Sequence, residues 1–538
     1  MKKHLRAISR REFIRLAALA SGAGLAAACA PGAPTTPAET GPKRGGVWRM
    51  ALPGNPTAYP ITAPGALVDI LVNKTIYNCL VKYELKNGSI QVVPDLAESW
   101  TVNDRLTEYT FRLRRGVKWH DGQPLTARDV KFTFDAIMDP KVNAAFRDVA
   151  AAIDGVEVVD EYTVRFVTKF PYASLPVVLG YNMPIVPRHA LEGQDLNQPT
   201  EFLKKPIGTG PFRFKQLVPG SYLETEANKE YFAGTPYLDG IIFKVIPDAN
   251  ARLAQVISGD IDFTVIEPPQ VDAVSGQPHL EVRRPPQVNY YFFAVNHRRP
   301  KLQDVRVRQA LAHAIDRDAI VKNFLRGYGK VATGPINPLL GDFYNPNVQK
   351  YEYNPAKAQQ LLEVAGWRKG PDGILTNSQG EKFEILFNGP KGYPVMEQVI
   401  VYAQQEYQKL GFKVTLDIVE WPVHLQKYHD GDYDLLMEWW ITPPDPDLYN
   451  HYHSKSPSNW WAYANPEVDD LIVRARSEPD RARRVALYHQ LQELLARDLP
   501  VIYLYYPEEI QALNKRTRGF RFMGYRDALT WMHEVWVE

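Results

Sequence analysis

The chain has 538 residues, of which 45% are hydrophobic and 23% charged, and its formal net charge is +2 at pH 7. This length predicts about three domains and allows a large hydrophobic core. The balanced charge provides no strongly basic surface, which excludes the usual electrostatic basis of nucleic-acid binding. We therefore expect a globular body and no nucleic-acid partner.

The first 29 residues have the composition of an export signal. Basic residues precede residues 9–15, Ser-Arg-Arg-Glu-Phe-Ile-Arg, and an apolar run of small residues then extends from Leu16 to Ala28. That run is too short to cross a bilayer, which takes roughly 20 apolar residues. Paired arginines before a weakly hydrophobic run resemble the twin-arginine (Tat) export signal. We expect the protein to be exported.

The residues before Cys29, Leu-Ala-Ala-Ala, resemble a lipoprotein cleavage site, although Ala26 stands where such sites usually have a larger apolar residue. Plain cleavage after the alanines is the alternative. Residues 30–46 are rich in Pro, Thr, Ala and Gly, which is typical of a flexible tether. We expect a protein that is lipid-anchored through Cys29 on the periplasmic or extracytoplasmic face of the cytoplasmic membrane.

Removal of the signal changes the charge and leaves few thiols. Residues 1–28 carry a net charge of +5, from six Lys or Arg and one Glu, so a chain of +2 becomes one of −3 without them. If Cys29 is acylated, Cys79 is the remaining thiol, and no intramolecular disulfide can form. An exported protein of this kind depends on its hydrophobic core for stability.

Residues 109–130 predict a strand, a tight turn and a helix. Asp121-Gly122 is typical of a turn, and Thr126 is typical of a helix N-cap. His120 stands beside Asp121, and an acid–base pair is one interpretation of these two residues. We favour the other, in which His120 is a packed turn residue.

Residues 350–445 alternate between strand and helix patterns. Asn354-Pro355 is typical of a helix start and Gly366 of a helix end. Strands are predicted at 383–387, 414–418 and 433–440. Helices are predicted at 395–410, in a short segment before residue 433, and from Asp480 towards a strand at 501–506. The β-α-β-α-β order implies parallel strands with right-handed crossovers.

Ligands of parallel sheets bind beyond the carboxyl ends of the strands. The loops at 388–393 and 441–447 follow two of the predicted strands and are therefore candidate parts of a binding site. Trp439 and Trp440 are neighbours in a strand and must face opposite ways, so one of them is a candidate ligand contact. Position predicts these ligand-binding residues: Tyr393, Trp421, Trp439, Trp440, Asp445 and Asp447.

Two further patterns admit a chemical interpretation. His451 and His453 would lie on one face of a strand as a metal pair, but no further ligands stand at a suitable spacing. Asp445 and Asp447 could form the carboxylate pair of a glycoside hydrolase, although the surrounding prolines favour a stiff loop. The sequence contains no nucleophile elbow, zinc helix, phosphate loop or dinucleotide fingerprint. We predict no metal, no cofactor and no enzymatic activity.

Five motifs lie at residues 94–100, 109–130, 206–212, 228–232 and 304–317. Together and in this order they resemble the extracellular solute-binding proteins of family 5, the peptide/nickel-type components of ABC importers. The resemblance implies an α/β, two-lobed periplasmic-binding-protein-like fold (type II) that closes over its ligand about a hinge. It implies this organisation: signal 1–29, tether 30–46, lobe I from 47–85, 195–300 and 506–538, inserted domain 86–194, and lobe II 301–505. The implied partners are a small-molecule ligand and the permease of an ABC transporter, and we expect a monomer.

In peptide-binding members of this family, an aspartate after the strand that matches 433–440 pairs with the amino terminus of the ligand. Here that stretch is Ile441-Thr442-Pro443-Pro444, and the first acid is Asp445. Dipeptide-binding members use an arginine in the loop that matches 388–393, where this chain has only Lys391. A buried charge without its partner costs about 3–5 kcal/mol, which argues against tight binding of free dipeptides.

Three hypotheses therefore stay open at the level of the sequence. The first is an importer-linked oligopeptide-binding protein in which Asp445 or Asp447 pairs with the amine. The second is an oligosaccharide-binding member with the sugar stacked on Trp439, Trp440, Trp460 or Trp461. The third is a secreted hydrolase that uses the carboxylates of 445–447. Family practice suggests that segments 46–60 and 291–296 complete the pocket from lobe I.

Overall fold

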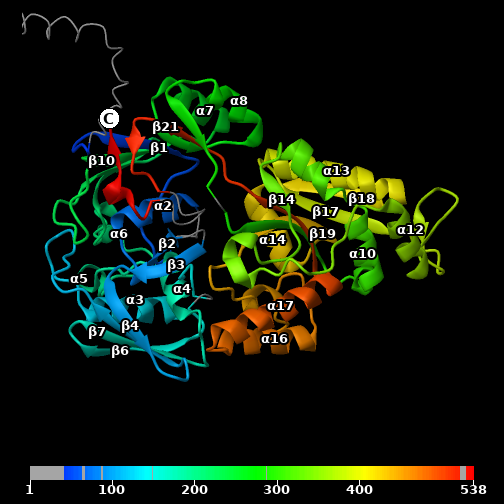
Figure 1. Cartoon of the computed structure of the whole chain (residues 1–538), viewed down its shortest axis with the longest axis horizontal. Helices are drawn as coiled ribbons and strands as arrows, with labels where there is room; N and C mark the ends of the chain where they lie inside the picture. The colour runs from blue at the N-terminus through cyan, green and yellow to red at the C-terminus, as the bar shows by residue number, and fades with distance from the viewer. Residues whose placement is uncertain (1–40, 63–66, 87–88, 148–149, 286, 522–528) are drawn as a thin grey trace, which may run out of the picture. The chain divides into compact units, whose positions relative to one another are not determined.

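The computed structural model describes residues 41–538 apart from 63–66, 87–88, 148–149, 286 and 522–528. The expected signal, the lipidation site Cys29 and the tether up to residue 40 lie outside the described residues. Within the described part of the chain, no helix has the length and apolar character that a bilayer crossing needs. Sheets of seven, six and four strands organise the fold (Figure 1).

The seven-stranded sheet takes strands from distant parts of the chain. They are β1 (Val47–Leu52), β8 (Phe212–Val218), β9 (Tyr222–Ala227), β10 (Gly240–Val245), β11 (Phe263–Val265), β12 (Leu280–Arg283) and β21 (Gln511–Asn514). Their order is β12-β21-β11-β1-β10-β9-β8. Because β1 runs parallel to both β10 and β11, these three strands end at one edge of the sheet. Helices α7 (Ala249–Ser258) and α8 (Val271–Ser275) follow β10 and β11 in the chain and lie near β21 (Figure 1).

The four-stranded sheet confirms the strand, turn and helix predicted at 109–130. Its strands are β4 (Ala97–Val102), β5 (Glu108–Leu113), β6 (Ile153–Asp160) and β7 (Thr163–Thr168), in the order β4-β5-β7-β6. Helix α3 (Ala127–Met138) begins at the N-cap Thr126, whose backbone N–H donates to Asp129 Oδ2 at 2.9 Å in a capping box. Val130 and Phe134 of α3 are fully buried against this sheet.

His120 has a structural role in the turn before α3. Gly208 N donates to His120 Nδ1 at 3.1 Å, so Nε2 carries the proton and donates to Gly210 O at 3.0 Å. Burial lowers the pKa of His120 to about 4, which keeps the ring neutral at physiological pH. Asp121 turns away and contacts His189 Nε2 at 2.7 Å. The two neighbours therefore do not form an acid–base pair with each other.

The six-stranded sheet confirms the β-α-β-α-β prediction. Its strands are β13 (Asn289–Val295), β14 (Gly329–Val331), β17 (Glu384–Pro390), β18 (Lys413–Val419), β19 (Leu435–Ile441) and β20 (Val501–Pro507), in the order β14-β20-β13-β19-β17-β18. β17 is parallel to β18 and to β19. The connecting helices are α13 (Pro394–Leu410) and α14 (Trp421–Asp430). Gly411, with φ of 101°, ends α13 in the left-handed region as predicted.

β13 lies in the middle of this sheet, between β19 and β20 and antiparallel to both. We expected lobe II to begin at residue 301, so β13 precedes that boundary but pairs within the six-stranded sheet. The physical reason is that β13 is apolar on both faces. Tyr290 and Phe292 pack into one hydrophobic cluster and Phe293 and Val295 into another, which only a central strand of a covered sheet permits.

Helices cover both faces of the six-stranded sheet. One face packs against α10 (Val305–His313), α12 (Pro355–Val364) and α13, and the other against α16 (Pro466–Ser477) and α17 (Arg481–Asp498), which lie side by side (Figure 1). The side chain of Asp480 caps α17 by accepting from Arg483 N at 2.8 Å, as its position predicted. Leu487, Leu491 and Leu495 of α17 point into the core.

The remaining elements are shorter connections. The helical ones are α2 (Leu67–Ile76), α4 (Leu175–Asn182), α5 (Arg188–Leu191), α6 (Thr200–Lys204), η1 (Pro268–Gln270), α9 (Pro300–Gln303), α11 (Arg317–Ala319), η2 (Ile320–Phe324), η3 (Pro338–Phe343), α15 (Tyr449–Tyr452) and η4 (Met532–Glu534). The extended ones are β2 (Val81–Lys86), β3 (Ser89–Pro94), β15 (Arg368–Lys369), β16 (Leu375–Thr376), β22 (Thr517–Arg518) and β23 (Trp536–Val537). His451 lies in α15, so the prediction that His451 and His453 share a strand face was wrong.

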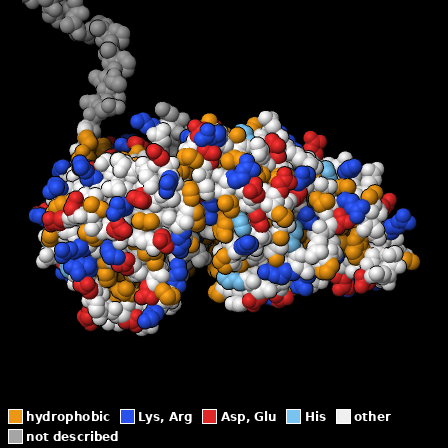
Figure 2. Space-filling model, turned by 90° about the horizontal axis from the view of Figure 1, so that it is seen from below, with side chains coloured by type: hydrophobic (Ala, Val, Ile, Leu, Met, Phe, Trp, Pro, Cys, Tyr) orange, Lys and Arg blue, Asp and Glu red, His pale blue; other side chains and the backbone are white. Residues whose placement is uncertain are grey.

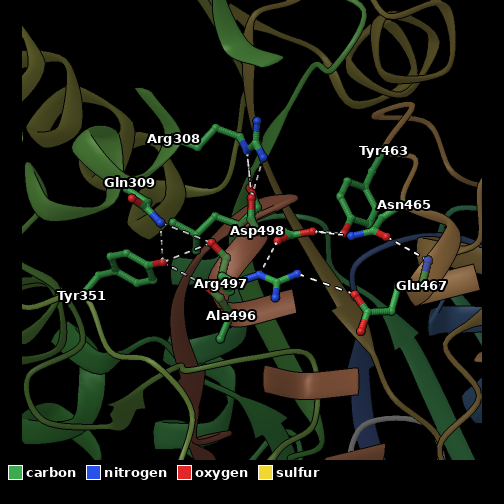
Figure 3. A network of polar contacts seen from close by, with 10 residues as sticks. Arg308, Gln309, Tyr351, Tyr463, Asn465, Glu467, Ala496, Arg497 and Asp498 are labelled. Carbon is green, nitrogen blue, oxygen red and sulfur yellow. Dashed lines mark hydrogen bonds and ion pairs between the residues drawn. The ribbon is translucent and has the colours of Figure 1, made fainter. Parts of the chain in front are cut away.

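A polar network holds α10 against the end of α17 (Figure 3). Arg308 of α10 donates from Nη2 to Asp498 O at 2.7 Å and from Nη1 to Gln303 O at 2.6 Å. The Asp498 carboxylate accepts from Asn465 Nδ2 at 2.6 Å and from Tyr463 Oη at 2.8 Å. Burial alone would raise the pKa of Asp498, but these hydrogen bonds lower it below its usual value. The 304–317 motif is thus structural at Arg308.

Acidic and basic side chains are interspersed over the surface seen in Figure 2, and neither sign covers a large continuous area there. This mixed distribution agrees with the near-neutral composition of the chain. On this face it provides no single-sign field of the kind that steers a polyanion.

Candidate functional site

The carboxyl ends of β17, β18 and β19 define one edge of the six-stranded sheet. Because β13 is antiparallel to β19, its first residue Asn289 pairs with Ile441, the last residue of β19, and β13 begins at this same edge. β20 ends there too, since Tyr505 pairs with Tyr291. The crevice rule for parallel strands therefore marks this edge as the candidate site.

Tyr393 and Trp421 come together at this edge. Tyr393 stands directly before α13 and is 41% exposed, and its ring centroid lies 5.3 Å from that of Trp421 at the start of α14. The Trp421 ring stacks in turn on His424 at 5.4 Å. Two of the six predicted residues thus form one partly exposed aromatic pair.

A buried polar network fixes His424 beneath that pair. Its Nδ1 lies 2.6 Å from Asn388 Oδ1 at the end of β17, and its Nε2 lies 3.3 Å from Glu438 Oε2 of β19. Asn388 Nδ2 donates to Asp417 O at 3.0 Å. These contacts tie β17, β18, β19 and α14 together, so the aromatic pair rests on a rigid base.

Trp439 and Trp440 face opposite sides of the sheet, as predicted from their adjacency in a strand. Trp439 lies beside Tyr291, with centroids 6.3 Å apart, and Tyr291 stacks on Tyr505 at 4.7 Å. Trp440 packs against His451 at 4.0 Å and donates from Nε1 to Tyr428 Oη at 3.3 Å. Both indoles are partly exposed, and they belong to separate aromatic groups.

Asp445 and Asp447 each have an arginine partner. Asp445 Oδ2 lies 2.8 Å from Arg484 Nη2 of α17, and Asp447 Oδ2 lies 2.9 Å from Arg476 Nη2 of α16. Arg476 also lies over the rings of Phe170, Tyr172 and Tyr449, 4.4–4.9 Å from their centroids.

Burial raises the pKa of Asp445, and Arg484 lowers it in part. Ser174 Oγ donates to Asp445 Oδ1 at 3.4 Å, so this ion-paired loop contacts the segment that follows the four-stranded sheet. A glycosidase requires one carboxyl group as acid and another as base or nucleophile. Two carboxylates that are each held by a guanidinium do not suit this division of roles, which weakens the hydrolase hypothesis.

Three other residues were considered for the site from the sequence, and the structure places them as follows. Lys391 pairs with Glu420 at 2.9 Å, and both side chains are exposed. Tyr291, which we expected from lobe I, belongs to the six-stranded sheet. His453 lies beside Tyr449 and is buried, and the described residues contain no cluster of metal-ligating side chains.

The seven-stranded sheet has a corresponding edge where β1, β10 and β11 end. After β11, Ile266 N donates to Ile510 O at 2.9 Å, and Val265 pairs with Gln511. The segments before β13 and after β20 both enter this region, because Arg283 also pairs with Gln511. Glu267 follows Ile266 here, and its side chain is exposed.

Tyr505 and Glu267 were missed by the sequence interpretation. Tyr505 was recognised only as part of a strand, and β11 has three residues, too few for a periodic signal.

Comparison with known proteins identifies the family. The model of the bacterial extracellular solute-binding proteins, family 5, matches residues 91–461. The oligopeptide-binding protein AppA of Bacillus subtilis is 33% identical over 498 residues, 90% of this chain and 91% of that protein. The structure of AppA with a nonapeptide has a TM-score of 0.82 at 32% identity and covers 92% of this chain and 100% of that one.

A second similar structure is that of NikZ from Campylobacter jejuni with Ni(L-His). It has a TM-score of 0.81 at 26% identity and covers 91% of this chain and 99% of that one. The fold, the motifs and the extent of these matches agree. The chain belongs to family 5 of the bacterial extracellular solute-binding proteins.

Proposed function

We propose that the protein is the substrate-binding component of an ABC importer, and that it captures an oligopeptide outside the cytoplasmic membrane and delivers it to the permease. The peptide lies against the edge formed by β17, β18 and β19. The observation that carries this proposal is the set of partly exposed aromatic side chains at that edge, resting on the buried Asn388–His424–Glu438 network. Aromatic faces suit the apolar side chains and backbone of a peptide.

The relatives support a peptide rather than a sugar. AppA is named for oligopeptides, and a second relative at 29% identity, from Escherichia coli, is named a dipeptide-binding protein. Tyr393, Trp421, Trp439 and Trp440 form the aromatic contacts of this proposal. Asp445 and Asp447 are the polar residues of the proposed site. We propose that they belong to the loop whose backbone faces the ligand. An oligosaccharide stacked on the tryptophans is the competing outcome of the test.

The proposal includes the export of the protein and its attachment to the membrane. Export by the twin-arginine signal, cleavage and acylation at Cys29 and a monomeric state together place the binding domain at the membrane surface, where the permease is reached. A single acyl chain binds a membrane only reversibly, so two or more chains provide a stable anchor.

The test is thermal unfolding of the purified protein with peptides of increasing length and with oligosaccharides. A ligand that binds only the native state stabilises it by about 2.7 kcal/mol at a concentration of 100 Kd. We expect oligopeptides to raise the melting temperature. Oligosaccharides that do so while peptides fail would show that the peptide assignment is wrong.

Tyr393→Ala links this result to the site, because Tyr393 is 41% exposed at the proposed edge. We expect peptide affinity to fall about tenfold, the equivalent of about 1.4 kcal/mol. Tyr353→Ala is the matched control, since Tyr353 is 43% exposed and precedes α12, away from the strand ends. Equal losses in the two variants would contradict the location of the site.

A further inference from the structure

A peptide with a free amino terminus brings a positive charge into its site, and the two aspartates near the aromatic edge are already paired. Arg484 and Arg476, which hold Asp445 and Asp447, are 6% and 8% exposed. Diverting either carboxylate to a ligand would leave a buried guanidinium without its counter-charge. The ammonium group therefore requires a different carboxylate.

Glu267 is such a carboxylate. It lies two residues after the end of β11, at the edge where β1 and β10 also end, and its side chain is exposed. Across the described ranges, no Lys, Arg or His side chain forms an ion pair with Glu267. The adjacent helical turn fixes its backbone: Gln270 N donates to Glu267 O at 2.9 Å, and Glu267 N donates to Gln270 Oε1 at 3.0 Å.

The surroundings of Glu267 favour the arrival of a cation. Loss of solvation raises the pKa of this carboxyl group, and the nearby charge of Arg252 offsets the effect only in part. Arg252 donates instead to Ile246 O at 2.9 Å and Pro247 O at 2.6 Å. A carboxylate that is reachable by solvent but poorly solvated gains most from a charged hydrogen-bond donor.

The backbone brings Glu267 next to the aromatic edge of the six-stranded sheet. Ile266 is hydrogen-bonded to Ile510, and the same segment leads back within a few residues to Tyr505 at the end of β20. The negative charge of Glu267 contributes to raising the pKa of the Tyr505 phenol, after burial and Tyr291. Tyr505 stacks on Tyr291, which lies beside Trp439.

We propose that Glu267 receives the ammonium group at the amino terminus of the bound peptide, with the first residues of the peptide lying against the partly exposed Tyr291 and Trp439, next to which Tyr505 is buried. This inference rests on the proposed function, and it assigns the recognition of the amine to the seven-stranded sheet. The aromatic contacts come from the six-stranded sheet. One peptide then bridges the strand ends of both sheets, which couples its binding to closure of the two around it.

The test compares one peptide with its N-acetylated form by titration calorimetry, in the wild type and in Glu267→Gln. In the wild type, we expect acetylation to weaken binding at least tenfold. Glu267→Gln should weaken the free peptide by a similar factor and leave the affinity for the acetylated peptide unchanged, so that the two ligands become equal. Glu281→Gln, in the edge strand β12 of the same sheet and also exposed, should keep the wild-type discrimination.

Three results separate this inference from the proposed function. If Glu267→Gln still binds the free peptide as much more tightly than the acetylated peptide as the wild type does, the role of Glu267 is overturned. If the two peptides instead become equal in Asp447→Asn, the amine is assigned to Asp447. Equal binding of both ligands to the wild type also overturns the role of Glu267, although peptide binding itself then stands. If neither peptide binds the wild type, the proposed function has failed. The acetylated peptide also reports whether Glu267→Gln retains a folded site.

Discussion

Glu509 lies on the segment that joins β20 to β21, and it is a buried carboxylate without a cationic partner. It is 7% exposed, and its two oxygens accept from Gln287 Nε2 and Gln511 Nε2, both at 2.6 Å. Among the described residues, no Lys, Arg or His forms an ion pair with it. Burial raises the pKa of Glu509 from 4.5 to about 7, and the two amide hydrogen bonds oppose this shift only in part.

This shift has a definite sign. Between pH 4.5 and 7 the native state binds a proton at Glu509 that the unfolded state has lost, so the free energy of unfolding falls as pH rises. The contribution of the protonated carboxyl is complete below pH 4.5 and is lost as pH rises through about 7. A difference of about 2.5 pKa units corresponds to about 3 kcal/mol. Because the group is buried, solvent screening does not reduce this figure.

Glu509→Gln removes the titrating group and keeps its shape. Gln511 Oε1 is buried without a hydrogen-bond partner in the described structure, so rotation of the Gln511 amide provides an acceptor for the new amide group. We expect the variant to be more stable than the wild type at pH 8, by up to about 3 kcal/mol, and the difference to shrink towards pH 5.

The assay is urea unfolding of the ligand-free wild type and variant at intervals from pH 5 to pH 8. Glu508→Gln is the control, because Glu508 is a partly exposed neighbour already paired with Arg284. It should show no comparable change with pH. A wild-type-to-variant difference for Glu509→Gln that is constant across this range would refute the reasoning, since it would mean that Glu509 does not titrate there.

Two further predictions concern stability. Arg476→Ala leaves the mostly buried carboxylate of Asp447 without its cationic partner and should cost about 3–5 kcal/mol of unfolding free energy, measured by thermal unfolding. Arg474→Ala, on the same helix but in an exposed pair with Asp470, should cost under about 1 kcal/mol; similar losses would contradict this account. Gly208→Ala should prevent folding or soluble expression, because its Cβ would lie 1.8 Å from Ile76 O, whereas Gly334→Ala has no atom within 4 Å and should be tolerated.

Local patterns were sufficient to predict the elements of the six-stranded sheet that follow one another in the chain. Asn354, Gly411 and Asp480 all act at helix ends as expected, since capping depends on hydrogen bonds within a few residues. The parallel order of β17, β18 and β19 followed from the connecting helices alone. Opposite orientations of Trp439 and Trp440 followed from the period of a strand.

The contacts that decide the site are long-range, and the sequence contains no local sign of them. Asp445 and Asp447 were expected to be available to a ligand. In the structure they instead form ion pairs with Arg484 and Arg476, which lie 39 and 29 residues further along the chain. The short strand before Glu267 was too brief to recognise, and β13 joined a sheet whose other strands come later. The sequence by itself therefore determined the family and the local elements, and it predicts an export signal. Only the tertiary structure decided which charges are neutralised and which remain exposed, because pairing depends on distances between segments that only folding brings together.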